Sequence, residues 1–258
     1  MRQWFDFLPF RIGTTSYIIP DDILPNVRYL ADRVRDVELV LFDIDEYCNI
    51  PDPGQITELN RIAEEHGLSY TVHLPLDLNF SDRDRDISLE KAMKVISGTK
   101  ALSPHAYVCH LESRDIPSAE GLLLGEWQRQ RISAVNTLAE MSGIGSGLAV
   151  ENLEHYPISW NEPVIRACGT HACLDIGHLF LQRIDPVPVI RHWLDITSVI
   201  HLHGIGTRDH QSLALMPAEA VHAVLTELID GNYRGVLTLE IFNEDDLNSS
   251  LEMIRECL

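Results

Sequence analysis

Eight short apolar segments, separated by longer amphipathic ones, run from one end of this 258-residue chain to the other. Most are rich in aliphatic and β-branched residues, which is typical of parallel strands buried on both faces. We predict strands over 11–18, 37–43, 69–75, 106–112, 147–154, 171–178, 197–204 and 235–242. A regular alternation of strand and helix indicates parallel strands joined by right-handed crossovers.

The segments between the strands carry helix signals. We predict helices over 21–35, 54–66, 87–102, 118–142, 160–168, 186–194, 217–230 and 244–257. Gly67, Gly143 and Gly231 follow helical runs where a left-handed cap residue is common, and Pro186 and Pro217 fall where first-turn prolines are tolerated. Eight strand–helix units predict one closed (β/α)8 barrel, a fold of about 250 residues, as a single domain. The alternative is an open doubly wound sheet, but no G-x-G-x-x-G follows the first strand.

The charge of the chain limits its partners. Asp and Glu number 39 against 20 Lys and Arg, which gives a formal net charge of −19 at pH 7. Nucleic-acid binding depends on clustered basic residues, so we expect a small-molecule substrate and no long DNA or RNA. The five cysteines are odd in number and contain no C-x-x-C pair, which argues against a disulfide framework. The sequence shows no secretion signal and no membrane-spanning apolar run, so we expect a cytoplasmic protein.

Histidine and carboxylate side chains recur near the C-terminal ends of the predicted strands. The C-terminal ends of barrel strands converge on one mouth, where the catalytic groups of such enzymes lie. A lone strand histidine is more often a hydrogen-bonded core residue than a ligand, but a carboxylate in an apolar strand is costly to bury without a partner. Mixed imidazole and carboxylate ligands suit zinc, manganese or iron. The candidate ligands are His73, His110, Glu151, Asp175, His178, His201, His203, Asp209, His210 and Glu240.

Strand alternation refines this set, because residues two apart in a strand share a face. His201 and His203 therefore point the same way, and both can enter the barrel. Cys173 and Asp175 also share a face, which predicts that Cys173 packs inside the barrel below Asp175. The remaining histidines are predicted to be surface or structural residues; these are His66, His105, His155, His171, His192 and His222.

Seven short motifs fall in an order that resembles the xylose-isomerase-like barrel superfamily. They are TVH (71–73), CHLE (109–112), AVENLE (149–154), LDIGH (174–178), HLHG (201–204), RDH (208–210) and LTLEIF (237–242). This superfamily includes sugar isomerases, epimerases and the endonuclease IV type of apurinic-site nuclease. The resemblance implies a divalent-metal cofactor, zinc first with manganese or iron as alternatives, and one to three ions.

The two branches of this superfamily imply different ligand sets. The nuclease branch implies a first ion on His73 and His110, bridged by Glu151 to a second ion. The second ion would be completed by Asp175, a histidine of the seventh strand and Glu240, and a third would lie on His178, Asp209 and His210. In the nuclease pattern one residue separates that acid from its histidine, whereas here they are adjacent. The mononuclear isomerase branch implies chiefly Glu151, Asp175, the seventh-strand histidine and Glu240.

A narrower resemblance concerns substrate. The segments RIGTTSYIIPDDILPNVRYLADRVRDVELVLFD (11–43) and RDHQSL (208–213) resemble the cobamide-remodelling phosphodiesterase (CbiR) family. This resemblance implies hydrolysis of the phosphodiester in the nucleotide loop of a cobamide.

Catalytic and substrate-binding residues are predicted on the same basis. Glu151 is the expected bridging residue, and Glu240 is expected either to bind metal or to position water. Substrate hydrogen bonds are predicted for Thr14, Thr15, Ser16 and Tyr17, at the end of the first strand, and for Arg208. The alternatives are a sugar or sugar-phosphate isomerase, and a non-catalytic corrinoid- or metal-binding protein.

Overall fold

Eight parallel strands close into a barrel in the computed structural model, which describes residues 5, 7–44, 47–112 and 121–258. The strands follow the order β1-β10-β9-β8-β7-β6-β5-β2 around the barrel, which confirms the predicted (β/α)8 fold. Their bounds are β1 (Arg11–Thr15), β2 (Asp36–Val40), β5 (Ser69–His73), β6 (Tyr107–Cys109), β7 (Leu148–Glu151), β8 (His171–Asp175), β9 (Thr197–Leu202) and β10 (Val236–Leu239).

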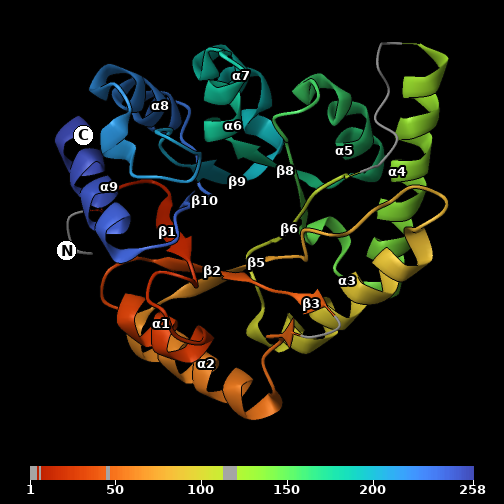
Figure 1. Cartoon of the computed structure of the whole chain (residues 1–258), viewed down its shortest axis with the longest axis horizontal. Coiled ribbons are helices and arrows are strands. Elements are labelled where there is room, and N and C mark those ends of the chain that lie inside the picture. The colour runs from red at the N-terminus through yellow and green to blue at the C-terminus, as the bar shows by residue number, and fades with distance from the viewer. Residues whose placement is uncertain (1–4, 6, 45–46, 113–120) are drawn as a thin grey trace.

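Helices encircle the strands, and the chain passes around this ring from α1 to α9 (Figure 1). Their bounds are α1 (Ile23–Leu30), α2 (Pro53–His66), α3 (Arg85–Thr99), α4 (Leu122–Ser142), α5 (Glu162–Cys168), α6 (Ile176–Leu181), α7 (Pro186–Trp193), α8 (Ala218–Asp230) and α9 (Glu244–Cys257). No helix in the described ranges is long and apolar enough to cross a membrane.

Local sequence explains where several of these helices begin and end. α2 starts with a capping box in which the Asp52 side chain accepts from the Gln55 N–H and Gln55 returns a bond to the Asp52 backbone. Gly67 ends α2 in the left-handed conformation, as predicted. Gly231 departs from the prediction, because it stays right-handed and Asn232 takes the positive φ of 53° instead.

Two elements differ from the predicted pattern. The strand predicted over 171–178 ends at Asp175, and the short helix α6 follows without a break. Two short antiparallel strands, β3 (Asp43–Ile44) and β4 (Tyr47–Cys48), form a small hairpin after β2. The predicted helix over 118–142 is described from residue 122, and 118–120 lie outside the described residues.

Small side chains fill the interior of the barrel below the carboxyl ends of the strands. They form a separate buried cluster of Ala106, Val108, Ala149, Cys173 and Val199. Cys173 lies two residues before Asp175 and packs inward, as its alternation predicts. All five cysteines are free thiols. This layer supports the polar groups at the mouth from beneath.

Candidate metal centre

Three groups of potential ligands meet at the carboxyl ends of the strands. Within each group, one ligand atom from every member lies within 4.8 Å of the others. The first group is His73, His110 and Glu151; the second is Glu151, Asp175, His201 and Glu240; the third is Asp175, His178, His203 and His210. Glu151 joins the first group to the second, and Asp175 joins the second to the third. The structure brings Cys173 near Glu151 and His201 as well.

The first group is centred on one oxygen of Glu151. Its Oε2 lies 3.2 Å from Nε2 of His73 and 3.2 Å from Nε2 of His110, and the two rings meet edge to face. His73 Nδ1 lies 2.7 Å from the carbonyl of Leu74, which can accept a hydrogen bond from it. A neutral imidazole that donates from Nδ1 presents an unprotonated Nε2, the form that binds metal.

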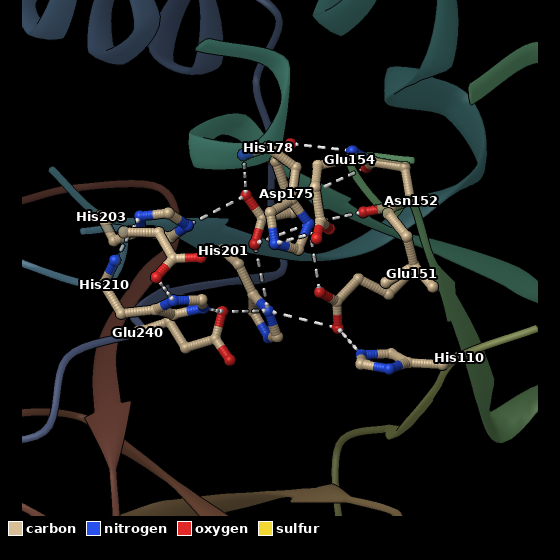
Figure 2. Close-up of polar contacts among 12 residues, drawn as sticks. His110, Glu151, Asn152, Glu154, Asp175, His178, His201, His203, His210 and Glu240 are labelled. Carbon is tan, nitrogen blue, oxygen red and sulfur yellow. Dashed lines mark hydrogen bonds and ion pairs between the residues drawn. The ribbon is translucent and has the colours of Figure 1, made fainter. Parts of the chain in front are cut away.

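The second group contains buried polar atoms that lack hydrogen-bond partners. His201 Nδ1 lies 3.1 Å from Glu240 Oε2, 3.5 Å from Glu151 Oε2 and 3.9 Å from Asp175 Oδ2. His201 Nδ1, Glu240 Oε2 and Asp175 Oδ2 are nevertheless without a hydrogen bond among the described residues. Buried polar atoms are costly to leave unpaired. Because these atoms converge (Figure 2), a cation between them would satisfy all three, and the donor set fits zinc, manganese or iron.

Glu38 contacts the ring nitrogen of His201 that faces away from the second group. It was not among the predicted site residues. Its Oε2 lies 3.0 Å from His201 Nε2, and both side chains are fully buried. A proton on Nε2 donated to Glu38 leaves Nδ1 unprotonated and directed at the carboxylates of the second group. Metal-bound histidines commonly donate their other ring N–H to a carboxylate in this way. A carboxylate in the apolar strand VELVL was the available sequence signal, the same signal that singles out Glu151 and Glu240.

The third group is assembled around the start of α6. Asp175 Oδ1 accepts from the His178 backbone N–H at 2.7 Å and so caps this helix. His178 Nδ1 lies 2.8 Å from the carbonyl of Asn152, and the Asn152 side chain makes two bonds to the Asp175 backbone. His203 Nε2 lies 3.5 Å from Asp175 Oδ1. These contacts join Asp175 of β8 and His178 of α6 to the segments that follow β7 and β9, and so orient the group (Figure 2).

The loop after β9 returns His210 to the mouth. Gly204 pairs with Gln211 in an isolated antiparallel bridge, which closes the loop, and His210 takes a left-handed conformation with φ of 52°. Its ring stacks on His203, with centroids 4.2 Å apart, and its Nε2 lies 3.3 Å from Glu240 Oε2. His210 therefore contacts both the second and the third groups.

Asp209 is the one predicted ligand that the structure does not bring into these groups. Its carboxylate lies 3.3 Å from His210 Nδ1, whereas the other ring nitrogen of His210 faces Glu240. Among the described residues, Asp209 therefore contacts the site only through the His210 ring. The third group contains His203 and Asp175 together with His178 and His210.

The charges of the site oppose the effect of burial. Burial alone would raise the pKa of Glu151, but the neighbouring His110 and His201 hold it well below its usual value. Burial alone would lower the pKa values of His73 and His178, but Glu151 raises the first to about 9 and Asp175 raises the second to about 9. The carboxylates thus attract positive charge strongly enough to outweigh burial, which is the field that a divalent cation needs.

The predicted substrate-binding residues of the first strand are mostly engaged within the barrel. Thr14 and Thr15 donate from Oγ1, at 2.8 and 2.6 Å, to carbonyls at and just after the end of β10. Ser16 Oγ accepts from the Val40 N–H of β2. All three are buried, so their hydroxyls tie β1 to its neighbours, and the structure does not present them to a substrate.

Tyr17 and Arg208 occupy different positions from those three residues. Tyr17 lines a cavity at the mouth. Arg208 is exposed in the loop after β9, where its guanidinium donates to the Asp209 carbonyl at 3.4 Å. Both side chains remain reachable from the mouth side of the barrel.

A closed β/α barrel with histidine and carboxylate groups at its mouth defines the class of this protein. The family described as xylose isomerase-like TIM barrel matches residues 35–257, and the chain belongs to that family. No curated protein matches the chain by sequence.

Several solved structures share this fold along nearly the whole chain. A D-tagatose 3-epimerase-like protein matches with a TM-score of 0.75 at 20% identity, over 96% of this chain and 97% of that one. A D-psicose 3-epimerase solved in the presence of D-fructose matches with a TM-score of 0.72 at 15% identity, over 96% of each chain. A 3-keto-D-glucoside 4-epimerase from E. coli matches with a TM-score of 0.70 at 16% identity, over 96% of this chain and 97% of that one. At these identities the likeness establishes the fold.

Proposed function

We propose that this chain is a metal-dependent hydrolase that cleaves a small phosphodiester. The observation that carries the proposal is the linkage of three ligand groups through Glu151 and Asp175. A reaction at a single ion needs only the second group and leaves the histidines of the first and third groups without a role. Adjacent cations suit phosphoryl transfer, in which charge must be neutralised on several oxygens at once.

The residues of the three groups would hold divalent cations, zinc first and manganese or iron as alternatives. When bound, such ions neutralise charge that develops on the phosphoryl oxygens and raise the acidity of water. Glu151 keeps its negative charge and belongs to both of the first two groups, where it would offset the positive charge of bound cations. Glu240, at the end of β10, either completes the second group or orients the attacking water.

The exposure of the site residues indicates where a substrate approaches. Glu151 is 1% exposed and His201 is fully buried, whereas the side chains of His110 and His210 are 14% and 20% exposed. Glu240 is 10% exposed. A phosphodiester therefore reaches the site between His110, His210 and Glu240, and the deeper residues hold their positions beneath it.

The finer substrate assignment rests on sequence resemblance. Residues 11–43 and 208–213 resemble the cobamide-remodelling phosphodiesterases, so we include the nucleotide-loop phosphodiester of a cobamide as the first substrate to test. The net charge of −19 supports a small substrate over a duplex, whose phosphates an acidic surface repels.

A second candidate function is the epimerisation or isomerisation of a sugar or sugar phosphate. The fold comparisons favour this candidate over the phosphodiesterase, because the similar structures are sugar epimerases. The second group would hold the ion, and Glu151 and Glu240 would be placed to move protons at neighbouring carbons. His73, His110 and His178 would then serve structure alone.

Product analysis separates the two candidates. Metal-loaded protein would be incubated with a cobamide, an abasic-site duplex and a panel of ketoses and aldoses, and its metal content would be determined by elemental analysis. We expect phosphodiester cleavage of the cobamide with more than one ion per chain. Efficient sugar interconversion with an intact cobamide would establish the epimerase instead. Metal binding with no turnover of any substrate would indicate a binding protein.

A further inference from the structure

An apolar cavity of about 460 Å³ opens at the mouth of the barrel, beside the metal centre. Its walls include Tyr17, Ile18, Val40, Phe42 and Phe242. None of the described residues that line it carries a charge, in contrast to the acidic groups next to it. Its volume falls within the roughly 300–1,000 Å³ of small-molecule sites.

Three chain segments supply the aromatic side chains. Tyr17 follows β1, Phe42 follows β2 and Phe242 follows β10, so the rings come from strands that are adjacent in the barrel. The rings of Tyr17 and Phe42 meet edge to face, with centroids 6.0 Å apart. Asn49 holds both residues, because its Nδ2 donates to the Tyr17 hydroxyl at 2.8 Å and its Oδ1 accepts from the Phe42 N–H at 2.6 Å.

The cavity is adjacent to the third ligand group. The Phe242 ring lies 5.8 Å from the ring of His210, measured between centroids, and Phe242 follows the candidate ligand Glu240 by two residues. Val40, on another wall, is paired in register with His73 of the first group. Phe242 is also 38% exposed, so its ring is accessible from the solvent side of the cavity.

We propose that this cavity binds a planar, uncharged ring of the substrate that is attached to the scissile phosphodiester. The proposal rests on the phosphodiesterase function proposed above, and it specifies which chemical group the phosphodiester substrate carries. Aromatic walls favour ring stacking and edge contacts. A sugar would need hydrogen-bond partners, but the Tyr17 hydroxyl already accepts from Asn49 and lies 3.3 Å from that of Tyr47.

The substrate test compares two diesters that share a leaving group. Metal-loaded wild type, Phe42→Leu and Phe242→Leu would be assayed with bis(p-nitrophenyl) phosphate and with methyl p-nitrophenyl phosphate. We expect each variant to raise KM for the bis-aryl diester about tenfold, and to raise KM less for the methyl diester, which offers the cavity only its leaving-group ring. Phe7→Leu is the matched control, because Phe7 is 69% exposed and precedes β1, at the opposite end of the barrel. An unchanged KM for the bis-aryl diester in both variants would overturn the proposal.

A binding measurement keeps this proposal separate from the catalytic one. Diphenyl phosphate and dimethyl phosphate would be titrated calorimetrically into the same metal-loaded proteins. We expect wild type to bind diphenyl phosphate about tenfold more tightly, and Phe42→Leu and Phe242→Leu to lose that preference. If this preference is found but no diester is hydrolysed, the phosphodiesterase function fails and the ring site stands. If wild type binds the two phosphates equally, the ring site is wrong whether or not hydrolysis occurs.

Discussion

Glu151 belongs to more than one of the ligand groups. It lies within reach of His73, His110 and His201, and its pKa is held well below the usual value by the charges around it. We expect Glu151→Gln to lower turnover about a hundredfold or more, because the change keeps the side-chain volume but removes the shared negative charge. Metal content should fall in parallel, and circular dichroism should show an unchanged fold. Full activity in this variant would exclude Glu151 from the mechanism.

Glu38 acts on the site through His201. We expect Glu38→Gln, which retains an acceptor but loses the charge, to weaken metal binding about tenfold, and Glu38→Leu, which loses both, to weaken it about a hundredfold. Competition with a chromophoric chelator measures both affinities. Glu64→Gln, at an exposed position of α2, is the matched control. Equal affinity in wild type and Glu38→Leu would show that the His201–Glu38 contact is only structural.

The buried carboxyl group of Asp36 makes the stability of the folded barrel depend on pH. It is fully buried in β2, and burial raises its pKa to about 6, although Ser69 and Arg11 partly oppose the shift. The unfolded chain releases this proton near pH 4, so the folded state loses stability as pH rises from about 4 to 6, by roughly 3 kcal/mol. Asp36→Asn removes this pH dependence. The free energy of unfolding of the variant, compared with that of wild type, should therefore increase by about the same amount between pH 4 and pH 7. Urea unfolding of both proteins at the two pH values measures it, and a pH-independent difference would contradict it.

At the scale of elements, the sequence predicted the eight strands and their closure into a barrel but not every boundary. Apolar periodicity identifies eight strands, yet it cannot distinguish a strand that continues to His178 from one that ends at Asp175 and starts a helix. The deciding contact is the Asp175 side chain on the His178 N–H, an N-cap that the apolar run of the predicted strand obscured. The hairpin of β3 and β4 was missed because two-residue strands carry no periodicity.

The same limit applies to side-chain roles. Thr14 and Thr15 were predicted to form hydrogen bonds with a substrate. Polar residues at a strand end are equally compatible with that role and with hydrogen bonds to a neighbouring strand, and the sequence does not separate the two. The structure uses them for the second purpose. Glu38 was passed over although it carries the same signal as Glu240, because its role depends on contact with a strand 163 residues later in the chain.

The junction between β8 and α6 supplies a test at this scale. A Cβ added at Gly177 would overlap the His203 ring, so the first turn of α6 and this histidine fit only when the residue is glycine. We expect Gly177→Ala to displace His203 and to weaken binding at the third group about tenfold, while the second group keeps its ion. Gly125→Ala, in α4, is the control, because its added Cβ meets only a flexible arginine side chain at 3.7 Å. Elemental analysis of both variants after dialysis measures the result, and an unchanged stoichiometry in Gly177→Ala would remove His203 from the centre.

At the scale of the whole molecule, the ligand groups connect most of the barrel wall. Their members come from β5, β7, β8 and β9, from α6, and from the segments that follow β6, β9 and β10. Several buried carboxylates therefore approach one another across the barrel in a chain whose net charge is already −19. Ions at this position would both compensate that charge and cross-link strands that are distant in sequence.

Metal removal should therefore destabilise the entire barrel. A ligand present at a thousand times its dissociation constant stabilises the folded state by about 4 kcal/mol, and a domain of this size shifts its unfolding midpoint by roughly 2–4 °C per kcal/mol. We expect a chelator to lower the midpoint by about 10 °C, and added zinc to restore it. Glu151→Gln should respond much less, because it starts with little bound metal, which separates loss of the ion from other effects of the chelator. Calorimetry with parallel elemental analysis measures both quantities, and a midpoint that stays constant while bound metal is lost would show that the ions do not hold these strands together.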